Sequence, residues 1–208
     1  MGDRAGDALP EGSTSGSHHV GPWTRHARRV AYENAWLTVY HDNVTRPDGR
    51  PGIYGVVHYA NVAVGVVAID GEDRVALVGQ HRYPLDILSW EIPEGGAPRG
   101  EDPLAGAVRE LREETGVAAR TWREIGRYHL SNSVSDEEAV VFLATDLERG
   151  EAQPDGSESD LVVRWVPFDE ALAMVLRGEI TDALAVLGLQ RVALERMGGQ
   201  GSVVSGAP

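Results

Sequence analysis

"GGAPRGEDPLAGAVRELREETGV", residues Gly95 to Val117, is the stretch that decides the fold. Its second half has the spacing of an amphipathic helix from about Pro103 to Thr115, and Gly116 follows where a left-handed cap is expected. Gly106, inside this helix, costs about 0.5–1 kcal/mol relative to alanine. Close packing of the backbone against a loop is one reason for a glycine at this position.

Three glutamates of this helix, Glu110, Glu113 and Glu114, lie within five positions of one another. At about 100° per residue they share an arc of roughly 100°, beside a separate apolar arc. That apolar arc contains Leu104, Val108 and Leu111. Like charges at this spacing repel by roughly 0.2–0.5 kcal/mol per pair, so their gathering suits hard divalent cations, which prefer oxygen ligands. The alternative is a solvated helix face, with Arg109 and Arg112 in weak surface ion pairs.

The composition limits the possible partners of the chain. Its 208 residues include 32 acidic and 19 basic side chains, and every basic residue is arginine. A net charge of −13 argues against a general nucleic-acid or anionic-membrane surface, so a phosphate-rich ligand would need local arginine or a bound cation. Because cysteine is absent, disulfides, thiolate catalysis and cysteine-ligated zinc are excluded.

The ends of the chain differ in composition from its centre. Residues 1–21, rich in Gly, Ser and Asp, predict a flexible leader, and residues 198–208 predict a flexible tail. The longest apolar run, Val62 to Ile69, is too short to span a bilayer as a helix. We therefore expect a cytoplasmic protein without a membrane partner.

Strand-like runs fill the first half of the central region. Residues 35–44 and 53–59 flank turn-forming residues and predict one hairpin, and residues 62–69 and 74–81 predict a second. The continuous apolar character of residues 62–69 indicates a strand covered on both faces.

The last third turns helical after three further strand-like runs. Two helices are expected, over residues 169–179 and 181–197, and Thr181 is a plausible N-cap of the second. The order of elements predicts an α/β fold, a sandwich around a mixed β-sheet.

The acidic segment also carries a recognisable spacing. Gly95, Glu101, Arg109-Glu110-Leu111, Glu113-Glu114 and Gly116-Val117 match G-x5-E-x7-R-E-U-x-E-E-x-G-U, with U aliphatic, at every specified position. A chance match is on the order of 10⁻¹⁰ per starting point at average residue frequencies. On this motif the chain resembles the Nudix hydrolases from about Trp36 to Met197.

The resemblance implies an α/β/α sandwich that hydrolyses a nucleoside diphosphate linked to another moiety. It also implies an N-terminal β subdomain for dimerisation at residues 22–60 and a catalytic domain at residues 61–197. A small-molecule nucleotide would be the substrate, and the protein would be a homodimer.

The resemblance further implies the residues of the catalytic site. Glu110, Glu113 and Glu114 would bind Mg²⁺ or Mn²⁺, together with the backbone carbonyl of Glu94. Arg109 and Glu101 would orient these carboxylates. Bound metal would neutralise the diphosphate and activate a water.

Residues 78–96, "VGQHRYPLDILSWEIPEGG", resemble the ADP-ribose pyrophosphatase branch of the family. There Arg82 would contact the diphosphate as a bidentate donor, and the alternative for Arg82 is an ion pair at the rim. Trp90 is expected to pack in the core, and the role of Glu91 is open.

The N-terminal hairpin resembles that branch as well. There the subdomain is exchanged across a homodimer, and Trp36 and Tyr54 occupy the places of aromatic residues that stack on adenine. A cross-strand aromatic contact that stabilises the hairpin is the alternative for each. The loop "SNSVSDE", Ser131 to Glu137, lacks a proline that the branch often carries, so GDP-mannose stays open as a substrate.

The resemblance to that branch also implies a catalytic glutamate outside the motif, in a mobile loop before the last strand. Glu158 matches its place and would act as general base, with Glu151 as the competitor and a solvated loop as the alternative. A module that binds ADP-ribose-like molecules without catalysis is the competing function.

Overall fold

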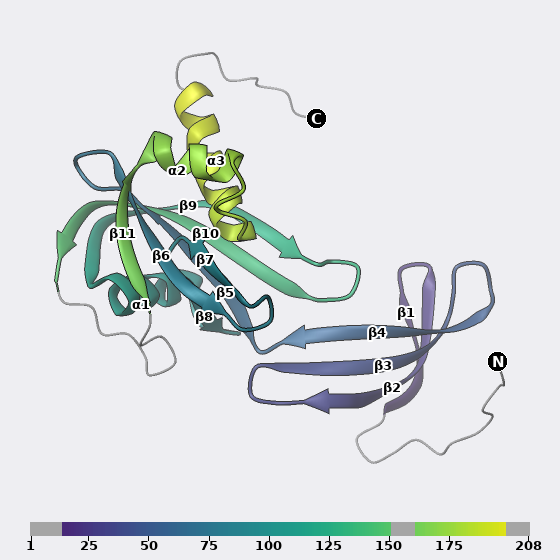
Figure 1. Cartoon of the computed structure of the whole chain (residues 1–208). Helices are drawn as coiled ribbons and strands as arrows, with labels where there is room; N and C mark the ends of the chain where they lie inside the picture. The colour runs from purple at the N-terminus through teal and green to yellow at the C-terminus, as the bar shows by residue number, and fades with distance from the viewer. Residues whose placement is uncertain (1–13, 151–160, 199–208) are drawn as a thin grey trace. The chain divides into compact units, whose positions relative to one another are not determined.

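The computed structural model describes residues 14–150 and 161–198, which form two compact units (Figure 1). One unit contains the described residues up to Asn61 together with His129–Glu137. The other contains Val62–Tyr128 and the described residues from Glu138 onward. The first unit thus includes residues 129–137, which the sequence analysis did not assign to the N-terminal subdomain.

The first unit is built on a four-stranded antiparallel sheet in the order β1-β2-β3-β4. The strands are β1 (Thr14–Val20), β2 (Trp23–Glu33), β3 (Leu37–Thr45) and β4 (Pro51–Tyr59). The predicted first hairpin corresponds to β3 and β4, in which Tyr40 lies opposite Val56. Strand β1 falls within the segment that we expected to be a flexible leader, and residues 1–13 lie outside the described residues.

The loop that joins β9 (Val117–Leu130) to β10 (Glu137–Arg149) lies along β4. The amide of Val57 donates to the carbonyl of Val134 over 2.8 Å, and the amide of Asp136 donates to the carbonyl of Val57 over 3.2 Å. The loop therefore continues the hydrogen bonding of the first sheet beyond its last strand.

The second unit contains two sheets and three helices among its described residues. Its remaining strands are β5 (Asn61–Ala68), β6 (Arg74–Arg82), β7 (Ile87–Glu91), β8 (Glu94–Pro98) and β11 (Val162–Pro167). Its helices are α1 (Pro103–Thr115), α2 (Phe168–Leu176) and α3 (Ala183–Gly198). One sheet has the order β8-β5-β10-β9 and the other β11-β6-β7, with β5 and β10 parallel. The fold is therefore mixed α/β, as predicted.

The predicted second hairpin is wrong, because β5 and β6 belong to different sheets. The two strands share an isolated bridge between Ile69 and Val75, after which β5 pairs with β10 and β6 pairs with β7 and β11. Residues 62–69 and 75–79 lack charged side chains, and such an apolar run indicates burial on both faces without specifying a partner strand.

Strand β5 is covered on both faces, as predicted. Val64 and Val66 belong to the buried cluster that includes Ala107 and Leu111 of α1. On the opposite face, a Cβ added at Gly188 of α3 would lie 2.8 Å from Val67. Figure 1 shows the same arrangement, with α1 on one side of the strands and α2 and α3 on the other.

Helix α1 begins and ends at the predicted residues. The side chain of Asp102 accepts a hydrogen bond from the amide of Leu104 over 3.0 Å, and Pro103 occupies the first helical position. At the other end, Gly116 has a φ of 70° and its amide donates to the carbonyl of Arg112. These caps fix which residues of the helix face the sheets.

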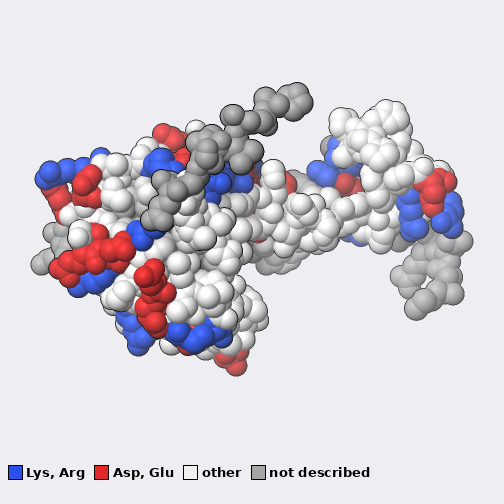
Figure 2. Space-filling view, turned by 90° about the horizontal axis from the view of Figure 1, so that it is seen from above, with Lys and Arg blue, Asp and Glu red and all other residues white. Residues whose placement is uncertain are grey.

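Charged side chains of both signs are interspersed over the face shown in Figure 2. Exposed ion pairs among the described residues include Arg127 with Glu124 and Arg177 with Glu179. No helix among the described residues is long and apolar enough to cross a bilayer.

Gly106 is held in the helix by contact with β8, so Gly106→Ala should destabilise the protein. The added Cβ would lie 2.7 Å from the Cβ of Ala97, a strand residue without room to move. We expect the free energy of unfolding to fall by about 1–3 kcal/mol, although alanine is the better helix former. Denaturant unfolding measures the difference. Ala105→Gly, at an exposed position of the same helix, should cost only about 1 kcal/mol, and a Gly106→Ala protein more stable than wild type would contradict the packing argument.

Candidate functional site

The three glutamates of α1 differ in burial. Glu110 and Glu114 are buried, with 7% and 2% of their surface exposed, whereas the side chain of Glu113 is 40% exposed. Carboxylates are rarely buried without partners because their desolvation is costly. Helix α1 therefore directs the carboxylates of Glu110 and Glu114 into the protein interior, whereas that of Glu113 is partly exposed to solvent.

The turn at the start of β8 lies directly against these carboxylates. The amide of Glu94 donates to Glu114 Oε2 over 3.0 Å. A Cβ added at Gly95 would overlap the carboxyl group of Glu110, so only glycine allows this approach. The backbone of Glu94, whose carbonyl was predicted to bind metal, thus lies beside the acidic side chains of the helix.

Arg109 connects the helix to the same turn. Its Nη1 donates to Glu110 Oε1 over 2.6 Å and to Glu113 Oε2 over 3.4 Å, and its Nη2 donates to the carbonyl of Gly96 over 2.8 Å. Glu101, at the exposed start of the helix segment, contributes to the electrostatic field at Arg109. One guanidinium thus holds two carboxylates and a backbone carbonyl in fixed relation.

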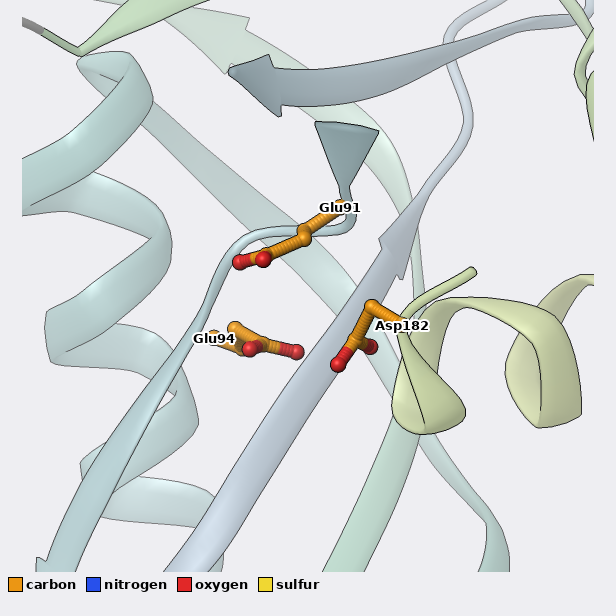
Figure 3. Close-up of side chains that lie close together, drawn as sticks. All are labelled: Glu91, Glu94 and Asp182. Atoms are coloured by element: carbon orange, nitrogen blue, oxygen red, sulfur yellow. The ribbon is translucent and has the colours of Figure 1, made fainter. Parts of the chain in front are cut away.

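A second group of carboxylates lies beside this turn. Glu91 ends β7, Glu94 begins β8, and Asp182 precedes α3, yet each contributes an oxygen to a group within 4.8 Å (Figure 3). Figure 3 shows the carboxylate of Glu94 pointing toward Asp182. Asp182 Oδ2 accepts the amide of Ala185 over 2.8 Å, so Asp182 caps α3 and the predicted N-cap, Thr181, is wrong by one residue.

Arg82 is the cation of this second group. Its Nε donates to Glu91 Oε1 over 2.8 Å, its Nη2 contacts Glu91 Oε2, and Nη2 also donates to Glu94 Oε1 over 2.8 Å. The bidentate pair with Glu91 fixes the plane of the guanidinium, and Nη1 makes no hydrogen bond to any residue that the structure describes. The side chain of Arg82 is 37% exposed, whereas that of Glu91 is 3% exposed.

Glu94 lies among more negative than positive charges. Burial raises the pKa of Glu94 well above its usual value, and the charges of Asp182 and Glu91 raise it further, while Arg82 opposes them. Glu94 Oε2 is fully buried and has no hydrogen-bond partner among the described residues. The group can therefore accept added positive charge or hydrogen-bond donors.

The aromatic candidates lie in the first unit. Trp36 is 70% exposed in the turn between β2 and β3. Tyr54 packs edge-on against Trp23, with ring centroids 5.2 Å apart, and its hydroxyl donates to the carbonyl of Ser133 over 2.6 Å. The carbonyl of Trp36 accepts the amide of Ala60, six residues beyond Tyr54, so the two aromatic residues are separated by about 20 Å along β4. They form no cross-strand pair with each other.

The remaining candidates have the following places. Trp90 packs its ring on the backbone of Gly79 and under the guanidinium of Arg164, whose Cζ lies 4.2 Å from the ring centroid. Glu158 and Glu151 lie outside the described residues.

Sequence reasoning missed Asp182. The only local signal was a Thr-Asp pair before an apolar periodic segment, which predicts a cap and gives no indication of a tertiary contact with residue 94. Glu91 was noted without a role, and its role in the structure is to hold Arg82.

Two family models match most of the chain. Residues 60–185 match the family model of the NUDIX domain, and residues 23–57 match that of the nucleoside diphosphate sugar hydrolase N-terminal domain. An ADP-ribose pyrophosphatase of Mycobacterium tuberculosis is 36% identical over 163 residues, which cover 77% of this chain and 78% of the relative. An ADP-ribose pyrophosphatase of Bacillus subtilis is 32% identical over 170 residues, covering 81% and 91%.

A relative of different specificity and a solved structure complete the comparison. The CMP-5'-(N-acetyl-N-hydroxy-3-aminopropyl)phosphonate hydrolase of Streptomyces rubellomurinus is 29% identical over 172 residues, covering 82% of each chain. The crystal structure of an ADP compounds hydrolase matches with a TM-score of 0.77 at 21% identity, covering 90% of this chain and 100% of the other. This likeness confirms the predicted fold class.

Arg82→Ala should be strongly destabilising, because it leaves Glu91 and Glu94 buried without their counter-charge. We expect a loss of about 3 kcal/mol, at the lower end for a broken buried pair because Arg82 is partly exposed. Denaturant unfolding measures it. Arg120→Ala breaks the exposed pair with Glu148 and serves as the matched control, with an expected cost of about 0–1 kcal/mol. Equal losses in the two variants would contradict the assigned electrostatic role.

Proposed function

The chain belongs to the Nudix family, and from this premise we propose that it hydrolyses the diphosphate bond of ADP-ribose, giving AMP and ribose 5-phosphate. The observation that carries the proposal is the set of carboxylates on α1 held against the turn at Glu94 and Gly95. Two ADP-ribose pyrophosphatases that are 36% and 32% identical to this chain over most of its length support the proposal.

Nudix hydrolases need a divalent metal, and the donors present suit one. Buried carboxylates with a backbone carbonyl beside them form an all-oxygen set of the kind that Mg²⁺ and Mn²⁺ accept. Glu110, Glu113, Glu114 and the carbonyl of Glu94 would hold the metal. When bound, the metal supplies charge neutralisation of the diphosphate and a water of lowered pKa.

The residues around the metal would act by positioning. Arg109 keeps Glu110 and Glu113 in place through its bonds to both and to Gly96. Arg82, whose Nη1 is left after its bonds to Glu91 and Glu94, would contact the diphosphate.

Two parts of the proposal rest on the resemblance rather than on contacts. Glu158, or Glu151 in its place, would take a proton from the attacking water. Trp36 and Tyr54 would stack on the adenine in a cytoplasmic homodimer, and the exposure of the Trp36 ring is compatible with that role.

A panel of nucleotides tests the substrate. With Mg²⁺ or Mn²⁺ present, purified protein should cleave ADP-ribose faster than GDP-mannose, other nucleoside diphosphate sugars and CMP-linked compounds, as followed by chromatography of the nucleoside monophosphate. The panel is broad because one relative acts on a CMP-linked phosphonate and the loop at Ser131–Glu137 departs from the branch. Faster cleavage of GDP-mannose than of ADP-ribose would make GDP-mannose the assigned substrate. Binding of ADP-ribose without turnover would favour a non-catalytic sensing module.

Glu114→Gln should reduce turnover by at least about 100-fold, because loss even of a partner to a metal ligand costs 10–100-fold. The amide keeps the size of the side chain but removes the charge that a metal needs. Steady-state turnover at saturating Mg²⁺ measures the effect, and circular dichroism checks the fold. Glu170→Gln, on the exposed face of α2, is the matched control and should retain full activity. Unchanged turnover in Glu114→Gln would remove Glu114 from the site.

A further inference from the structure

Arg82 holds its two carboxylate partners in different ways. Glu91 takes the Nε–Nη2 side of the guanidinium with both of its oxygens, and its side chain is only 3% exposed. Glu94 accepts from Nη2 alone, through Oε1 over 2.8 Å. Its other oxygen, Oε2, is buried and has no hydrogen-bond partner among the described residues. Glu91 is therefore the firmly bound partner of Arg82, and Glu94 is the weakly bound one.

Together the two carboxylates occupy both hydrogens of Arg82 Nη2. This nitrogen carries one hydrogen on the side of Nε and one on the side of Nη1. Because Glu91 takes the Nε side, the contact with Glu94 uses the hydrogen that lies beside Nη1. Glu94 therefore occupies one of the two nitrogens on the Nη1–Nη2 edge of the guanidinium.

A phosphate that binds Arg82 in bidentate fashion needs the same edge. Guanidinium groups bind phosphate most strongly through two parallel N–H donors on one edge. Glu91 closes the Nε–Nη2 edge, so the Nη1–Nη2 edge is left for a phosphate. A phosphate and the Glu94 carboxylate are both anions and repel one another. The phosphate can therefore take both nitrogens only if Glu94 leaves Nη2.

The surroundings of Glu94 favour its release. Arg82, Glu91 and Glu94 border a pocket of about 450 Å³, so a ligand can reach the guanidinium, whose side chain is 37% exposed. Glu91, Glu94 and Asp182 each contribute an oxygen to a group within 4.8 Å, so neighbouring negative charges repel the Glu94 carboxylate (Figure 3). The amide of Glu94 also donates to Glu114, which places this edge of Arg82 beside the carboxylates of α1.

We propose that Glu91 and Glu94 have opposite effects on the binding of the diphosphate. Glu91 is a positioning residue that presents Arg82, whereas the side chain of Glu94 is a competing carboxylate that the diphosphate displaces from Nη2. The inference rests on the proposed function and extends it by giving the side chain of Glu94 a role separate from that of its backbone carbonyl. The Glu94 side chain thereby lowers the affinity for the substrate.

Glu94→Gln tests the competition. Glutamine keeps the size of the side chain and the backbone carbonyl, but its neutral oxygen accepts from Arg82 more weakly than a carboxylate does. The ligand is an ADP-ribose analogue in which a methylene group replaces the bridging oxygen of the diphosphate. With Mg²⁺ present, its dissociation constant, measured by isothermal titration calorimetry, should fall about tenfold.

Asp182→Asn is the matched control for Glu94→Gln. It removes an equal charge from the same group of carboxylates, but Asp182 makes no hydrogen bond to Arg82 and instead caps α3. The dissociation constant of the analogue should therefore fall by less than about twofold. A larger fall in Glu94→Gln than in Asp182→Asn separates competition for Arg82 from a general effect of charge.

Glu91→Gln should have the opposite effect to Glu94→Gln. Without the Glu91 charge, the guanidinium is held by the Glu94 carboxylate, and the dissociation constant of the analogue should rise about tenfold. Two purely structural glutamates would instead shift the constant in the same direction. If thermal unfolding shows that Glu91→Gln is misfolded, the comparison of Glu94→Gln with Asp182→Asn decides the inference.

The outcomes separate the inference from the proposed function. An unchanged or higher constant in Glu94→Gln, or a fall no larger than in Asp182→Asn, would overturn the competition, while cleavage of ADP-ribose by the wild type would still uphold the proposed function. If the variants bind the analogue in the expected order but the wild type cleaves no nucleotide, the inference is upheld and the proposed function is wrong. Failure of the wild type to bind the analogue would overturn both.

Discussion

The contact between one turn of α1 and three consecutive backbone positions of the segment entering β8 is the constraint on which the site depends. Glu114 accepts the amide of Glu94, Glu110 occupies the space above Gly95, and Arg109 donates to the carbonyl of Gly96. Each of these contacts uses a charged side chain on a backbone group. These contacts hold the carboxylates in place, which reduces the conformational entropy that a ligand bound there would have to remove.

The same turn links two groups of carboxylates with different surroundings. The helix carboxylates share Arg109, and the group at Glu94 shares Arg82. Since the amide and the side chain of Glu94 point to different groups, a small shift of this residue would disturb both. Arg109 and Arg82 thus each offset the repulsion between neighbouring carboxylates.

The sequence was sufficient for features that depend on local spacing. The cap at Gly116, the burial of β5 on both faces and the β3–β4 hairpin follow from turn residues and apolar periodicity. It was insufficient where the partner is remote: β5 and β6 separate into different sheets, and Asp182 meets Glu94 across 88 positions of the chain. Neither feature can be read from the sequence pattern, because an apolar strand can pair with many other strands and a capping aspartate can lie beside many different residues.

The tip of the β9–β10 connection has a consequence for how the chain can be divided. Val57 both donates to Val134 and accepts from Asp136, so the small N-terminal sheet includes residues encoded more than seventy positions later. The main chain crosses from one unit to the other three times, near residues 61, 128 and 137. Cutting the gene before residue 62 would strand the amide of Asp136 and the carbonyl of Val134 without their acceptor and donor. The first unit is therefore built from two separate segments of the chain, and its sheet depends on the loop at residues 129–137.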